Sequence, residues 1–144
     1  MFDDNYYMKQ ALKEALRAFD EDEVPIGAIV VCRDQIIARA HNMVERLNDV
    51  TAHAEMQAIT AAAEALGGKY LNECTLYVTV EPCPMCAGAI GWSQLSRLVY
   101  GAPDSKRGYT LIAPHALHPK TQVCGGVLEE ECAKLMKNFF ARKR

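Results

Sequence analysis

The segment from residue 74 to residue 102 limits most strongly what this chain can fold into. It reads CTLYVTV, then EPCPMCAGAIGWSQLS, then RLVYGA. The first and last runs are rich in β-branched and aromatic residues and predict strands, with a short helix between them. Pro84 suits the first turn of that helix, because the N–H that proline lacks has no helical partner there. Strand, helix and strand in succession predict a crossover unit with two parallel strands.

Upstream of this unit, the pattern adds two helices and two more strands. Apolar residues at helical spacing predict a helix over residues 4–20. The run VPIGAIVVCRDQIIARAHN, rich in Val and Ile, predicts two strands around a turn near residues 33–35. Thr51 is a candidate cap for a helix that runs to Leu66, where Gly67–Gly68 stop it.

The C-terminal third is less regular. After Gly101 the chain carries Pro, Gly and charged residues, which predict a loop with one short helix and one short strand. Behind Gly125–Gly126, apolar residues at helical spacing predict a final amphipathic helix. Because no repeat or linker interrupts the pattern, we expect residues 1–144 to form a single α/β domain, with helices on both faces of a mixed sheet.

Composition sets the compartment and the state of the cysteines. No apolar run is long enough to span a bilayer, and the N-terminus lacks the layout of a secretory signal, so we expect a cytoplasmic protein without a membrane partner. A chain of 144 residues needs no disulfides for stability, so reduced thiols are expected. Four scattered cysteines are predicted to fill the core: Cys32, Cys74, Cys124 and Cys132.

Charge is a weak guide to the partner. The formal net charge of −2 argues weakly against nucleic-acid binding, but it is unevenly spread. The first twenty-three residues are rich in Asp and Glu, whereas the chain ends in KNFFARKR. Terminal charge runs are usually just solvated, so the asymmetry decides nothing by itself.

Cys83 and Cys86 form a Cys-x-x-Cys turn at the start of the predicted third helix. Such a turn brings two thiolates to one metal, and zinc prefers thiolate and imidazole ligands. The exposed N–H groups of a helix start also favour thiolate over thiol. The same spacing occurs in redox pairs, although those usually belong to thioredoxin-like units, which this chain does not resemble.

The sequence TAHAE places His53 and Glu55 at the head of the second long helix. On an ideal helix Glu55 shares an apolar face with Ile59, Ala62 and Leu66, and a carboxylate on a buried face is costly unless it has a partner. Taken alone, Glu55 would be a first-turn residue favoured by the helix dipole, and His53 a core histidine. Together with the two cysteines, they indicate a metal site.

One His and two Cys give zinc three protein ligands and leave a fourth position for water, as in catalytic sites. Other histidines could complete a structural site, but none has tight spacing to the pair: His41, His115 and His118. Zinc lowers the pKa of bound water from about 15.7 to about 7 in favourable sites. An acid/base residue must then carry protons to the leaving group, a role that Glu55 fits better than ligation.

HAE followed thirty residues later by PCPMC is the known signature of zinc-dependent nucleobase deaminases. The chain resembles the cytidine/deoxycytidylate deaminase superfamily, and within it the bacterial tRNA adenosine deaminases. The segments that carry this resemblance are EVPIGAIVV, AHN, TLYVTVEPCPMCAGAI, RLVYGA and GVLEEECAKLMKNFF. The resemblance implies a three-layer α/β/α sandwich around a five-stranded mixed sheet and, normally, a homodimer.

The resemblance also implies roles for individual residues. His53, Cys83 and Cys86 would hold one zinc ion per chain, and Glu55 would be the catalytic proton carrier. Asn42 would bind the substrate nucleoside; alternatively, it caps a turn at the end of a strand. The implied reaction is hydrolytic deamination of adenosine to inosine at the wobble position (34) of tRNA anticodons, by attack of zinc-bound hydroxide on C6.

The loop over residues 102–123 departs from the tRNA deaminases, because SKRGY…LHPKTQV replaces the expected Gly/Ala/Ser-rich stretch and Asn-His pair. EPCPMCAGAIGW also resembles guanine deaminases. Two alternatives therefore remain: a deaminase of a small purine or nucleoside such as guanine, and a non-catalytic, zinc-stabilised RNA-binding module. Five basic residues are candidate contacts to the anticodon stem-loop: Lys106, Arg107, Arg142, Lys143 and Arg144.

Overall fold

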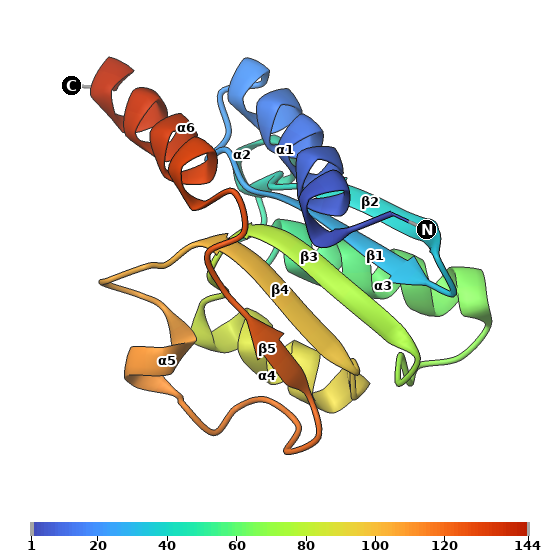
Figure 1. The fold of residues 1–144 in the computed structure, drawn as a ribbon. Helices are drawn as coiled ribbons and strands as arrows, with labels where there is room; N and C mark the ends of the chain where they lie inside the picture. Colours follow the sequence, from blue (N-terminus) through green and yellow to red (C-terminus); the bar gives the residue numbers. More distant parts are fainter. Residues whose placement is uncertain (1, 144) are drawn as a thin grey trace.

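The computed structural model describes residues 2–143, which contain one five-stranded mixed sheet (Figure 1). The strand order is β2-β1-β3-β4-β5. β1 is antiparallel to both of its neighbours, whereas β3, β4 and β5 are parallel. The strands are β1 (Gly27–Cys32), β2 (Gln35–His41), β3 (Cys74–Val80), β4 (Arg97–Ala102) and β5 (Gln122–Cys124).

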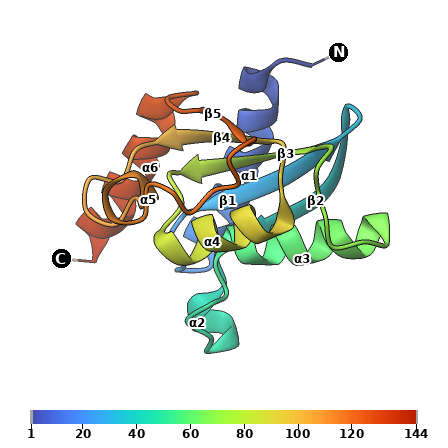
Figure 2. The same cartoon turned by 90° about the horizontal axis from the view of Figure 1, so that it is seen from below.

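Helices cover both faces of this sheet. α1 (Asp4–Asp20) and α6 (Glu129–Arg142) lie on one face, and α3 (Ala54–Leu66) and α4 (Pro84–Ser93) lie on the other (Figure 2). Two helices of four residues each lie in loops: α2 (Val44–Leu47) and α5 (Tyr109–Ile112). The predicted three-layer α/β/α arrangement is confirmed, and so is the crossover β3-α4-β4, in which Pro84 is the first helical residue.

The core consists of two apolar layers, one on each face of the sheet. Side chains alternate along a strand, so a central strand such as β1 contributes to both layers. Val30 packs toward α3 and α4, whereas Ile29 packs toward α1 and α6. Cys32, Cys74 and Cys132 are buried in these layers as predicted, Cys124 is half-buried, and all six cysteines are free.

The segment between β2 and α3 differs from the prediction. Thr51 does not cap α3: its N–H and hydroxyl both donate to the Asp49 carboxylate, at 2.8 and 2.7 Å. The helix begins three residues later, with His53 in the N-cap position. Leu66, predicted to lie on the buried face, is 44% exposed. Helix α2 was not predicted, because its N-cap residue, Met43, has no side chain that can accept a backbone N–H.

The carboxyl ends of three strands and the amino ends of two helices lie together along one edge of the sheet, the edge formed by strand ends. β2 and β3 run in the same direction, because both are antiparallel to β1, and β4 is parallel to β3. The carboxyl ends of these three strands therefore lie at the same edge. The amino ends of α3 and α4 begin there as well, and the two helices contact each other. Within residues 2–143, no helix is long and apolar enough to cross a membrane.

Candidate metal centre

His53, Cys83 and Cys86 meet at this edge. His53 is the N-cap of α3, Cys83 is the N-cap of α4, and Cys86 lies in the first turn of α4. His53 Nδ1 lies 3.4 Å from Cys86 Sγ and 3.7 Å from Cys83 Sγ. All three ligand atoms lie within 4.8 Å of one another, and no fourth side chain of a metal-binding type joins them in the part of the chain that the structure describes.

These positions fit a zinc ion. Tetrahedral zinc with ordinary bond lengths places a ligand sulfur and a ligand nitrogen about 3.5 Å apart, close to the two observed distances. The donor set fits as well, since two sulfurs and one imidazole nitrogen are what zinc prefers. Three protein ligands leave one coordination position for water or substrate, which is the arrangement of catalytic rather than structural zinc sites.

The protein by itself holds only one of the two cysteines as a thiolate. Hydrogen bonding from Cys86, and also from His53, lowers the pKa of Cys83 to about 4. The hydrogen bond to Cys83 and burial both raise the pKa of Cys86 above its ordinary value, and the hydrogen bond with Cys83 raises that of His53. Two adjacent thiolates repel each other, so a cation between them is what allows both to ionise.

Glu55, at the second position of α3, is a carboxyl group with 3% of its surface exposed. Burial raises its pKa to about 7, and it also hydrogen-bonds with Cys86. A carboxyl group that titrates near pH 7 can both take up and release a proton under physiological conditions. The structure therefore places a carboxyl group that can exchange protons beside the three candidate ligands.

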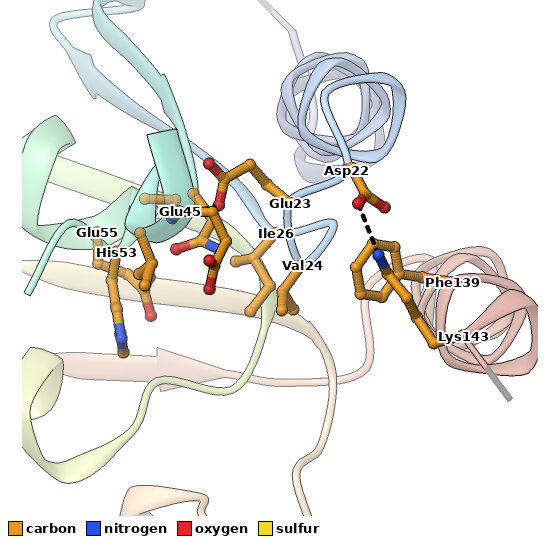
Figure 3. A pocket seen from close by; sticks show the side chains of 12 residues that line it. Asp22, Glu23, Val24, Ile26, Glu45, His53, Glu55, Phe139 and Lys143 are labelled. Carbon is orange, nitrogen blue, oxygen red and sulfur yellow. Dashed lines mark hydrogen bonds and ion pairs between the residues drawn. The ribbon is translucent and has the colours of Figure 1, made fainter. Parts of the chain in front are cut away.

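Two cavities meet at His53. The larger, of about 560 Å³, is lined by Asn42, His53 and Glu55, by the segment from Asp22 to Ile26, and by Phe139 and Lys143 near the end of α6 (Figure 3). The smaller cavity, of about 470 Å³, is lined mostly by apolar side chains, and Arg107 brings a positive charge to its wall. Its lining residues are Val50, His53, Cys83, Pro84, Met85, Arg107 and Ile112. His53 thus lines both cavities, and Glu55 lines the larger one.

The remaining candidate site residues are spread around these cavities. Arg107 lines the smaller cavity, and Lys106 is exposed beside it. Lys143 lines the larger one, although it also bonds to Asp22 at 2.6 Å. Arg142 donates to the Phe19 carbonyl oxygen and to Asp22. Arg144 lies outside the described residues.

None of the other histidines joins the group. His41 ends β2 as predicted, and its ring lies between two carboxylates, 3.0 Å from Glu21 and 3.6 Å from Glu14. His115 and His118 lie in the loop between α5 and β5.

Two buried carboxylates near the site did not emerge from the sequence: Glu23, 1% exposed, and Glu81, 5% exposed. The sequence offered one signal for each of them: Glu23 precedes the apolar strand β1 in EVPIGAIVV, and Glu81 follows the apolar strand β3 in TLYVTVEPC. That signal is weak, because a Glu at a strand end is usually solvated.

Comparisons with known proteins agree with this site. Residues 1–102 match the family model for the cytidine and deoxycytidylate deaminase zinc-binding region. The chain is 46% identical to the tRNA-specific adenosine deaminase of Bacillus subtilis, over 100% of this chain and 92% of that protein.

Two solved structures share the fold. One comes from a study of A-to-I editing by tRNA:A34 deaminases at the wobble position of transfer RNA; it has a TM-score of 0.84 and 45% identity, over 90% of this chain and 98% of its own. The other is a guanine deaminase from Nitrosomonas europaea, with a TM-score of 0.84 and 25% identity over 98% of this chain and 86% of its own.

The geometry predicts one zinc ion per chain. Cys83→Ser and His53→Ala should lose most of the metal and unfold at lower temperature, because zinc that binds only the folded chain stabilises it. Metal analysis and thermal denaturation measure both effects. Cys32→Ala, at the opposite edge of the sheet, is the control and should keep its zinc. Full zinc occupancy in both ligand variants would contradict the assignment.

Proposed function

This chain belongs to the family of zinc-binding cytidine and deoxycytidylate deaminases, and we propose that it converts adenosine to inosine at the wobble position (34) of tRNA anticodons. The reaction consumes one water molecule and releases ammonia. The support for tRNA as substrate is the high identity, over nearly the whole chain, to relatives that carry this activity in their names. The support for the chemistry is Glu55, buried against the candidate zinc ligands at the wall of a cavity.

In this proposal, His53, Cys83 and Cys86 hold the zinc ion, which supplies an activated water for attack on C6 of the adenine. Glu55 would take one proton from that water and deliver it to the purine ring; it would then take the second proton from the new hydroxyl on C6 and give it to the amine, which leaves as ammonia. These transfers need a group that is a base at one step and an acid at the next. Burial raises the pKa of Glu55 above its ordinary value, which favours the protonated form that the acid step needs.

Asn42 is the proposed contact to the nucleoside. Its backbone N–H donates to the Ile26 carbonyl oxygen at 3.1 Å, which fixes the residue at the cavity wall beside His53 and Glu55. Asn42 is 6% exposed, and it lines the cavity together with His53 and Glu55. This position supports a contact between its amide and a bound nucleoside.

We also propose a cytoplasmic homodimer. Helix α4 and the segment around α5 expose several large apolar side chains: Met85, Trp92, Leu111 and Ile112. Trp92, at 86% exposed, is the most conspicuous of them. Helices α4 and α5 contact each other, and Met85 and Ile112 line the same cavity. Large apolar side chains exposed on adjoining elements favour burial against another protein surface. A second copy of this chain would cover them.

The substrate test compares tRNA, free adenosine and free guanine with the same zinc-loaded protein, by measuring inosine in digested tRNA and released ammonia. We expect turnover on tRNA. Faster turnover of guanine than of tRNA would assign the chain to the guanine deaminases, and tRNA binding without turnover would indicate an RNA-binding module.

Glu55→Ala should keep zinc and fold but lose activity by roughly 10⁴-fold, the upper end for a general acid/base residue. Retention of a tenth of the activity would exclude Glu55 as the proton carrier.

Asn42→Ala should weaken nucleoside binding without loss of zinc. Removal of one hydrogen bond to a substrate typically costs about 1 kcal/mol, or roughly a fivefold loss in kcat/KM. Asn42→Asp is the matched variant: it keeps the size and the acceptor oxygen but replaces the amide donor by a second oxygen, which carries negative charge. If both variants matched the parent protein in kcat and KM, Asn42 would have no role in substrate binding.

The basic C-terminus should contribute to RNA affinity through phosphate contacts. Each contact to a single strand contributes about −0.7 to the slope of log affinity against log salt concentration. Replacement of Arg142, Lys143 and Arg144 by Gln should flatten this slope by up to about 2 if all three make contact. Lys69→Gln is the control, because Lys69 follows the far end of α3, about 20 Å from His53. An unchanged slope would show that these three side chains make no phosphate contacts.

A further inference from the structure

Glu81 is a buried carboxylate between the end of β3 and the Cys83–Cys86 turn. Its two oxygens bond to a distant segment of the chain rather than to the candidate metal ligands. Oε1 accepts the N–H of Asp104 at 3.0 Å. Oε2 accepts both the N–H of Thr110 at 3.1 Å and its hydroxyl at 2.6 Å. A single side chain therefore holds both ends of the segment 104–110.

The fit between Glu81 and this segment is tight. A Cβ at Gly108 would clash with Glu81 Oε2 and with the backbone carbonyl oxygen of Asp104, so only glycine allows the backbone to pass there. The next residue, Tyr109, donates its N–H to the Pro82 carbonyl oxygen at 2.9 Å and is buried in the core. The segment thus lies directly against the two residues that precede Cys83.

Between these anchors, the segment turns outward and presents Lys106 and Arg107. The Asp104 carboxylate accepts the N–H groups of both residues at 3.0 Å, which defines the turn. Arg107 then lines the smaller cavity, in which His53 and Cys83 also take part. A guanidinium at that place suits a phosphate of a bound nucleic acid.

Glu81 also takes the place of a local helix cap. The N-cap residue of α5 is Gly108, which has no side chain to accept the first N–H groups, and Glu81 accepts that of Thr110 from across the fold. Glu23 does the same for α2, where it accepts the N–H groups of Glu45 and Arg46 at 3.0 and 2.7 Å. Two buried carboxylates therefore hold the two loops on either side of the site.

We propose that Glu81 is a positioning residue for substrate: it holds the segment 104–110 so that Arg107 contacts a phosphate next to the reactive adenosine. This inference rests on the proposed function, since it needs an RNA substrate. Glu81 itself does not touch substrate and moves no proton. Its contribution acts through Arg107 and should appear in substrate binding rather than in the chemical step.

Glu81→Gln is the variant to test, because it keeps the size but replaces one acceptor oxygen by an NH₂ group, which cannot accept from the N–H groups of the segment. We expect KM for tRNA to rise about tenfold, kcat to change less than twofold, and zinc to remain at one per chain. The salt slope should flatten by about 0.7, the loss of one phosphate contact. Glu73→Gln, on an exposed carboxylate, is the matched control.

The deciding measurement is a double-mutant cycle with Arg107→Ala. If Glu81 acts through Arg107, Glu81→Gln should have little further effect on KM in the Arg107→Ala background. Independent, multiplied effects would overturn the proposal, as would a loss of zinc or a fall in kcat with KM unchanged. Thr110→Val, which removes only the hydroxyl donor, should show the same KM effect in weaker form and serves if Glu81→Gln does not fold.

Hydrogen exchange separates this proposal from the proposed function. The amides of Asp104 and Thr110 should exchange faster in Glu81→Gln than in the parent protein, whatever the substrate is. If the parent protein failed to deaminate tRNA while these amides lost protection, the proposed function would fail and Glu81 would still be the anchor. Unchanged protection of both amides would overturn the anchoring role itself.

Discussion

The burial of Glu55 against two cysteines and a histidine is the interaction on which the site depends. Its place near the amino end of α3 favours the charged form. Burial opposes this effect and outweighs it, so the pKa of the carboxyl lies above its ordinary value. A buried carboxyl group that can exchange protons therefore lies where the amino ends of α3 and α4 meet.

The charged side chains around the two cavities bear on how an acidic chain could bind RNA. The larger cavity carries several acidic side chains, among them Asp22, Glu23 and Glu45, which would repel a phosphate. Basic groups line both cavities as well: Lys143, which bonds to Asp22, lines the larger one, and Arg107 lines the smaller one. On the proposed function, the acidic side chains favour entry of a neutral base into the larger cavity, and Arg107 offers a phosphate contact in spite of a net charge of −2.

Much of the fold could be predicted from local pattern. Helix α1 has the predicted bounds, the turn between β1 and β2 lies at Arg33–Asp34 with both residues at positive φ, and the crossover through α4 follows from β-rich runs around Pro84. The failures lie between β2 and α3. There Thr51 bonds to Asp49 instead of the helix, and α2 forms without a local cap because Glu23 supplies one from 22 residues away.

The sequence by itself determined the chemistry that is available: a His-x-Glu and a Cys-x-x-Cys, each at the start of a helix, in a chain whose strands form one mixed sheet. Only the tertiary structure decided that His53 meets cysteines 30 and 33 residues away, that Glu55 is buried enough to titrate near pH 7, and that Glu81 holds Asp104 and Thr110. The reason is physical. Helix and strand periods reflect contacts between near neighbours in sequence, whereas desolvation and long-range hydrogen bonds exist only once the layers have packed.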